Sequence, residues 1–240
     1  MKRVCLIFLM SGFYFFDLSA QVKGIRSING NLISNQLPNL LSDEDIFDGL
    51  LEMLLYASNA AIQSASKFNG FNNNPDIKIY FPKESKKIKK ILIKAGMNNH
   101  VVAFEEKLNR TAEIAAKEAL PILENAVRSL TISNVIDIKN GSSNEATLYL
   151  KEKSYLKIYN KIIPIIKTKV SETNVLDYWD LLQKKYNMLP FTKPVNQDIE
   201  EYITEMTIEG IFVLIAAKEK EIRKNPKITS SVLLQELFKK

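Results

Sequence analysis

Residues 208–217 constrain the fold more than any other segment, because this run is apolar at every position except Glu209 and Gly210. A helix that is hydrophobic around its whole circumference needs other helices around it to keep it from water. The run lies inside a longer helical pattern from about Asp198 to Lys224, which stops before Pro226 because proline disfavours helix at the preceding residue. The sequence therefore predicts a bundle with a central hydrophobic helix near 198–224.

The rest of the chain is also periodic in the manner of helices. Ser42 precedes three acidic residues and an apolar stripe, as an N-cap does at the start of a helix. Two long helices contain Pro121 and Pro164 and are expected to kink there. The fold class is all-α, with a single helical domain over 42–240. Further helices are predicted at about 83–96, 99–130, 132–139, 143–169, 175–186 and 230–240, and a short extended segment is predicted at 77–81, where Ile77, Ile79 and Phe81 alternate with polar residues or Tyr80.

The N-terminus has the pattern of a secretory signal peptide. Lys2 and Arg3 precede an apolar run that gives way to Asp17 and then to Ala20, and the run is shorter than the roughly 18 residues that span a membrane. We expect cleavage near Ala20, so that residues 1–20 are removed and the protein is periplasmic or secreted. Residues 21–41 are polar and predicted to form an irregular arm.

The charges after the apolar run raise two alternatives. Steps of three and four from Ile208 place Glu219 on the continuation of the apolar stripe, and Arg223 follows in the order that favours a helical ion pair. Either the helix enters solvent near Lys218 and the charges are its wet end, or Glu219 and Arg223 face a polar pocket or a buried partner such as Arg110, because a buried carboxylate needs a partner.

Residues 109–121 form a second constellation. Arg110 and Glu113 share one face of the predicted helix, while the other side is small. Small side chains either let a neighbouring helix approach closely or leave room for a ligand. The side chains concerned are those of Ala112, Ala115, Ala116 and Ala119.

The segments "GFNNNPDIKIYFP", "NRTAEIA", "LTISNVIDIKNGSSNEATLYL" and "DIEEYITEMTIEGIFVLIAAKEKEIRKNP" occur in that order. In this respect the chain resembles the bacterial domain-of-unknown-function 4197 family. The resemblance implies an exported, largely helical protein and supplies no catalytic residue. The sequence departs from the family pattern at Thr111, Leu130 and Asn134. The residues on which the pattern can be laid include Asn109, Arg110, Glu113, Thr131, Gly141, Thr147, Tyr149, Tyr202, Gly210, Glu219 and Arg223.

The inventory of side chains argues against most enzymatic chemistry. His100 is the sole histidine and Cys5, in the predicted signal peptide, the sole cysteine, so a histidine triad, a catalytic thiol in the mature chain and a multi-histidine zinc site have no residues to build them. Hydrolysis by a pair of carboxylates would require the side chains of Glu113 and Glu219 to lie close together. No phosphate-binding glycine motif occurs. We expect no metal, no cofactor and, given a net charge of only +6 and export, no nucleic acid.

Two functions remain. The first is an exported non-catalytic protein that binds a lipid or other hydrophobic small molecule in a cavity enclosed by the alanine-rich and aromatic helices, where Arg110 or Arg223 could hold an acidic head group. The second is an envelope structural or interaction protein with a solid core, which contacts an anionic membrane through a basic amphipathic helix at 83–96. That helix carries the candidates Lys86, Lys87, Lys89, Lys90 and Lys94. The alternative is an ordinary amphipathic helix that docks on the core and keeps its lysines in solvent. The ligand-binding or buried polar cluster is predicted at Asn109, Arg110, Glu113, Thr131, Thr147, Tyr149, Tyr202, Glu219 and Arg223.

Overall fold

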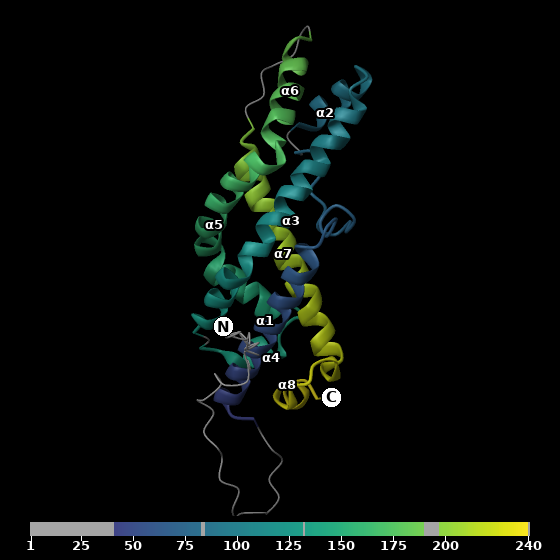
Figure 1. Ribbon diagram of the computed structural model, residues 1–240. Helices are drawn as coiled ribbons and strands as arrows, with labels where there is room; N and C mark the ends of the chain where they lie inside the picture. Colours follow the sequence, from purple (N-terminus) through teal and green to yellow (C-terminus); the bar gives the residue numbers. More distant parts are fainter. Residues whose placement is uncertain (1–40, 83–84, 132, 190–196, 240) are drawn as a thin grey trace, which may run out of the picture. The chain divides into compact units, whose positions relative to one another are not determined.

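The computed structural model describes residues 41–82, 85–131, 133–189 and 197–239 (Figure 1). The predicted signal peptide and, apart from Leu41, the predicted polar arm lie outside the described residues. Both therefore stay predictions.

Every regular element among the described residues is helical, which confirms the predicted all-α class. The described residues form helices α1 to α8 and a short 3-10 helix, with longer connections between α1 and α2 and between α6 and α7. The helices are α1 (Asp43–Ala65), α2 (Lys86–Lys94), α3 (Asn98–Arg128), α4 (Val135–Asn140), α5 (Glu145–Thr173), α6 (Val175–Asn187), α7 (Ile199–Lys224), η2 (Pro226–Ile228) and α8 (Val232–Leu237).

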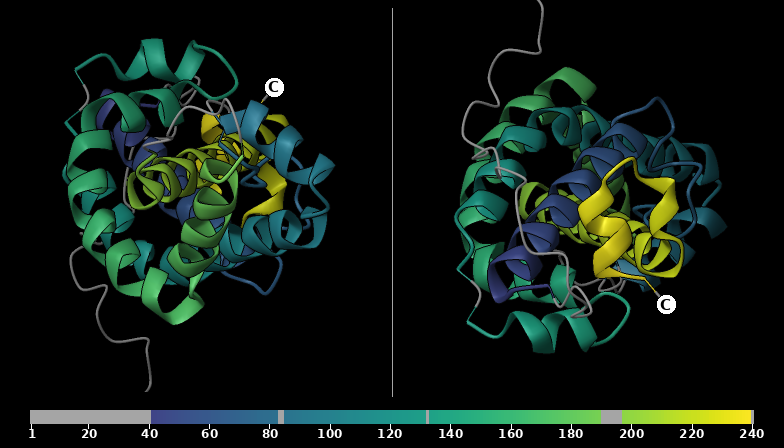
Figure 2. Two further views of the ribbon diagram at one scale, coloured as in Figure 1. Left: turned by 90° about the horizontal axis from the view of Figure 1, so that it is seen from above. Right: turned by 90° about the horizontal axis from the view of Figure 1, so that it is seen from below.

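Helix α7 is the central helix that its apolar run predicts. It packs against α1, α5 and α3, and Figure 2 shows it in yellow-green among these helices. Ile208, Phe212 and Ile215 on its stripe are all buried. Burial of large apolar side chains on a helix with neighbours on several sides provides the main driving force for the bundle.

Polar caps fix the helix ends close to their predicted positions. The Ser42 side chain accepts a hydrogen bond from the Asp45 backbone, and the Asp45 carboxylate accepts one from the Ser42 backbone, which together form a capping box at the start of α1. The Asp198 side chain caps α7 by accepting one hydrogen bond, from Glu201 N–H. Helix α5 runs four residues beyond the predicted Lys169, because no helix breaker intervenes before Asn174, whose left-handed φ of 54° ends it.

Both long helices continue through their prolines, α3 through Pro121 and α5 through Pro164. The kinks predicted at these residues stay predictions.

The segment between α1 and α2 packs directly against α7. Ile77, Ile79 and Phe81 are buried while Tyr80 is half exposed, which matches the predicted alternation, although no strand pairs with this segment among the described residues. Gly210 lets the segment approach α7 closely, since a Cβ at this position would lie 2.7 Å from Cε1 of the buried Phe71 ring. Lack of a side chain at Gly210 thus makes room for an aromatic anchor.

Candidate functional site

Glu105, Asn109 and Glu113 form a polar row on one face of α3, because they are spaced by four residues. The row binds the backbone of the segment between α1 and α2. At one end Glu113 Oε1 accepts hydrogen bonds from the N–H groups of Phe71 (3.2 Å) and Asn72 (3.4 Å). Glu113 is buried, so these bonds and an ion pair compensate for its lost hydration.

The middle and the other end of the α3 polar row bind the extended part of the same segment. Asn109 Oδ1 accepts from Ile79 N–H and Asn109 Nδ2 donates to Ile79 O, both at 2.8 Å. Glu105 accepts from Phe81 N–H at 2.7 Å. The side chains supply the hydrogen bonds that a neighbouring strand would otherwise provide, which is how a buried extended segment exists without a sheet.

Arg110 pairs with Glu113 and not with Glu219. The distance from Arg110 Nη1 to Glu113 Oε2 is 3.2 Å, and the Arg110 guanidinium also lies 5.3 Å from the centre of the exposed Phe68 ring. The sequence-based suggestion of a contact between Arg110 and Glu219 was therefore wrong. Glu113 and Glu219 bind different segments.

The side chain of Glu219, from α7, contacts the N-terminus of α5. Its carboxylate accepts hydrogen bonds from Ala146 N–H (3.0 Å), Thr147 N–H (2.7 Å) and Thr147 Oγ1 (2.5 Å). The first turn of a helix has N–H groups without partners and a partial positive charge, so a carboxylate is the favoured group there. Glu219 is fully buried, whereas Lys220 and Glu221 beside it are exposed, so the solvated-end alternative holds for those charges and not for Glu219.

Arg223 extends this arrangement to α4. Its Nε donates to Glu219 Oε1 at 2.8 Å, while Nη1 and Nη2 donate to the carbonyls of Lys139 (2.6 Å) and Ile138 (2.9 Å) in α4. A cation is favoured at carbonyls near a helix C-terminus. The α7 ion pair, Glu219 with Arg223, thus holds the end of α4 and the start of α5 on the central helix.

The remaining predicted residues also connect segments. Tyr149 donates to Thr131 O at 2.6 Å, and Tyr202 donates to Tyr80 O at 3.0 Å. The predicted polar cluster is thus divided between at least two separate sets of contacts, each of which joins parts of the fold. The small face of α3 packs closely against the rest of the bundle, since its alanines are completely buried. They are Ala112, Ala115, Ala116 and Ala119.

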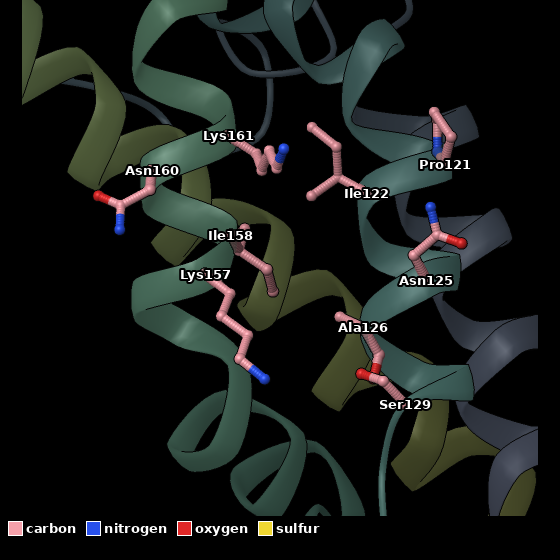
Figure 3. A pocket seen from close by; sticks show the side chains of 9 residues that line it. All are labelled: Pro121, Ile122, Asn125, Ala126, Ser129, Lys157, Ile158, Asn160 and Lys161. Carbon is pink, nitrogen blue, oxygen red and sulfur yellow. The ribbon is translucent and has the colours of Figure 1, made fainter.

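A groove of about 570 Å³ lies between the C-terminal half of α3 and the middle of α5 (Figure 3). Its apolar side chains are Pro121, Ile122 and Ala126 from α3 and Ile158 from α5. Polar and charged groups complete the lining, namely Asn125, Ser129, Lys157, Asn160 and Lys161. The groove is a concave, mainly apolar space with a few polar groups, as small-molecule sites usually are.

A smaller polar space, which we call the annex, adjoins this groove. It has about 200 Å³ and shares Ala126, Ser129 and Lys157 with the groove. Lys153 lies in the annex, where a hydrogen bond to Glu152 raises the pKa of its ammonium group. The other residues of the annex are Leu130, Thr131, Tyr149 and Ser154, so two of the predicted site residues border it.

A different pocket, of about 380 Å³, lies beside the ion pair of Arg110 and Glu113. Its charges balance, because Glu106 and Glu113 oppose Lys107 and Arg110. Lys107 is occupied as a donor to Thr173 O at 2.8 Å. The pocket has no net attraction for one sign of charge, whereas the groove and annex have lysines and no acidic residue in their linings.

The basic helix α2 docks on the bundle through its apolar face. Ile88 and Leu92 are buried, and Lys89 forms an ion pair with Glu105 of the α3 polar row. Lys86, Lys90 and Lys94 are exposed; the side chain of Lys87 lies outside what the structure describes. Three lysines of the predicted membrane surface therefore face solvent.

Within the described residues no helix is long and apolar enough to span a membrane. In the same part of the chain, no three histidine, cysteine or carboxylate side chains come together as metal ligands.

A family model described as a protein of unknown function, DUF4197, matches residues 40–239. The chain belongs to this family. No curated protein and no solved structure matches it. The segments through which the sequence resembles DUF4197 contain the α3 residues Asn109 and Glu113 and the α7 ion pair. In this DUF4197 chain these residues form hydrogen bonds between helices and loops. The motifs therefore specify contacts that hold the segments of the bundle together.

The groove was not predicted from the sequence. Lysines recur at every fourth position of α5, at Lys153, Lys157 and Lys161, and this spacing places them on one helical face. The pattern alone does not distinguish a solvated face from the rim of a groove. The distinction depends on how far α3 lies from α5, which is a property of the packed bundle of this DUF4197 protein.

Proposed function

We propose that this protein is an exported, non-catalytic binding protein that holds a lipid or other hydrophobic small molecule in the groove between α3 and α5. The observation that carries the proposal is the apolar lining of a groove of about 570 Å³, in which Pro121 and Ile122 are accessible to solvent. Small-molecule sites typically have volumes of about 300–1,000 Å³ and mainly apolar linings.

The chemistry of the lining supports binding. Pro121 is exposed and Ile122 is half buried, so a hydrocarbon chain placed against them would remove apolar surface from water, whereas Ile158 is already almost completely buried by the protein. Such burial contributes roughly 25 cal/mol for each Å². The polar groups of the groove are amides, a hydroxyl and two ammonium groups, which orient a ligand by hydrogen bonds and charge.

The N-terminal sequence supports export. Lys2 and Arg3, the apolar run after them and the small residues that end at Ala20 form the three parts of a secretory signal peptide. An exported protein with a hydrophobic groove suits the handling of lipids in the cell envelope.

Native mass spectrometry tests the proposed groove. The mature protein, purified from the bacteria that produce it, is incubated with dodecanol, and the bound fraction is measured for the unmodified protein and for Asn125→Trp. Asn125 is exposed and lines the groove, so an indole at this position fills the space. We expect a one-to-one complex with the unmodified protein and its loss in Asn125→Trp.

Leu156→Trp is the matched control, because Leu156 is an exposed residue of α5 outside the groove lining. This variant should bind dodecanol as the unmodified protein does. Absence of a one-to-one complex with dodecanol, or equal binding by the two tryptophan variants, would contradict the proposal.

A second candidate function is peripheral membrane contact through α2. Lys86, Lys90 and Lys94 are exposed on this helix, and Ile93 beside them is also exposed. Binding of this kind depends on charge and weakens as salt rises. Sedimentation with anionic vesicles at low and high salt, compared for the unmodified protein and a variant in which these three lysines are glutamine, tests it.

A further inference from the structure

We infer that the groove selects an anionic amphiphile, a molecule with a hydrocarbon chain and a carboxylate or phosphate head group that binds Lys157. This inference rests on the proposed function, and it adds the chemical class of the ligand and its orientation. The hydrocarbon chain lies along Ile158 and Ile122, and the head group lies where the groove meets the annex.

The charge of the lining carries the first step. Lys157 and Lys161 lie in the groove, Lys153 and Lys157 border the annex, and neither lining contains an aspartate or a glutamate. On the rest of the described surface, lysines are frequently paired with carboxylates, as Lys151 is with Glu209 at 2.6 Å. The combined space therefore attracts anions.

The second step is the availability of the ammonium groups. Lys153 is paired with Glu152 at 2.7 Å and lies near the Tyr149 ring. Among the described residues, by contrast, neither Lys157 nor Lys161 has an ion-pair or hydrogen-bond partner for its ammonium group. An ammonium group has three donors, so these two lysines can bind a carboxylate or phosphate without breaking an existing contact.

The third step is position. Figure 3 shows the Lys157 side chain reaching from α5 toward Ser129 on α3, and the Lys161 side chain toward Ile122. Lys157 lines both the apolar groove and the polar annex. An anion bound there has a polar space on one side, while the chain attached to it continues over Ile158 into the apolar part. Lys161 lies beside that chain, so its charge makes a smaller contribution.

Calorimetric titration of the full chain with four ligands of one chain length tests the inference. Laurate and dodecyl phosphate carry the proposed head groups, dodecanol carries none, and dodecyltrimethylammonium carries the opposite charge. A charge-assisted hydrogen bond to Lys157 should make both anions bind about tenfold more tightly than dodecanol, and the cation should bind more weakly than dodecanol.

Lys157→Gln should remove this preference, so that laurate and dodecyl phosphate bind this variant no more tightly than dodecanol does. Lys161→Gln should reduce it less. Lys167→Gln is the matched control, since Lys167 is an exposed lysine of α5 outside both linings, and it should bind all four ligands as the unmodified protein does.

The outcomes separate this inference from the proposed function. Equal binding of laurate, dodecyl phosphate and dodecanol, with no effect of Lys157→Gln, would overturn the head-group assignment and leave the hydrophobic groove intact. Binding of none of the four would overturn the proposed function itself. A preference for phosphate over carboxylate, or the reverse, lost in Lys157→Gln, would support the inference and identify the head group.

Discussion

Glu219 and Arg223 lie one turn apart on the central helix, with Arg223 Nε 2.8 Å from Glu219 Oε1, and each binds the end of a different helix. The carboxylate accepts from the first N–H groups of α5, and the guanidinium donates to the last carbonyls of α4. Each charge thus lies where the helix dipole favours it.

Removal of the Glu219 charge should destabilise the fold strongly. Glu219→Gln leaves Arg223 without its counter-charge and places an amide donor against the N–H groups of Ala146 and Thr147. Loss of one partner of a buried pair costs about 3–5 kcal/mol. Urea unfolding measures the change in the free energy of unfolding.

Lys218→Ala is the control on the same helix, because the pair of Lys218 with Glu221 is at the surface. We expect it to cost at most about 1 kcal/mol. An equally small cost for Glu219→Gln would show that the α7 ion pair does not hold α4 and α5 in place.

Asn109→Leu should release the extended segment from α3. Leucine has a similar volume but neither donates to Ile79 O nor accepts from Ile79 N–H. Each buried backbone group left without a partner costs about 1–3 kcal/mol. Hydrogen exchange should become faster at the amide of Ile79, and Asn125→Leu, at an exposed site on the same helix, should leave that rate unchanged.

Gly210→Ala should destabilise the protein although alanine is the better helix former. The substitution gains about 1 kcal/mol in helix propensity, but the new Cβ would lie 2.7 Å from the buried Phe71 ring and 3.2 Å from Ile77 Cβ. Overpacking of this kind costs about 1–3 kcal/mol. In a Phe71→Leu background the cost of Gly210→Ala should be smaller, and thermal unfolding of the unmodified protein, the two single variants and the double variant measures the difference.

The cap at the start of α1 should become less stabilising in acid. Hydrogen bonds from Ser42 lower the pKa of Asp45 below its ordinary value of 3.8, so the folded state binds this proton less readily than the unfolded state does. The contribution is therefore complete above the unfolded pKa and is lost as pH falls through the lowered one. Ser42→Ala should lower the melting temperature at pH 7, and its difference from the unmodified protein should shrink below about pH 3.8.

Local sequence features predicted the helices well, because periodicity, caps and prolines act over a few residues. The position of Glu219 on an apolar stripe left burial of its carboxylate as one of two alternatives, and the structure shows that it is buried. Its partners could not be identified this way, since Thr147 is 72 residues away along the chain and Ile138 is 85 residues from Arg223. The groove depends on the distance between α3 and α5. A local sequence pattern does not predict this distance, so the groove could not be predicted.

The measurement that tests the binding account most directly is photocrosslinking of the full chain with a laurate analogue that carries a diazirine near the end of its chain. Peptide mass spectrometry then locates the adducts. We predict adducts within 121–126 of α3 and 158–161 of α5, which unlabelled laurate competes away and Asn125→Trp abolishes. Adducts confined to other segments, or labelling that laurate does not reduce, would contradict a ligand site between α3 and α5.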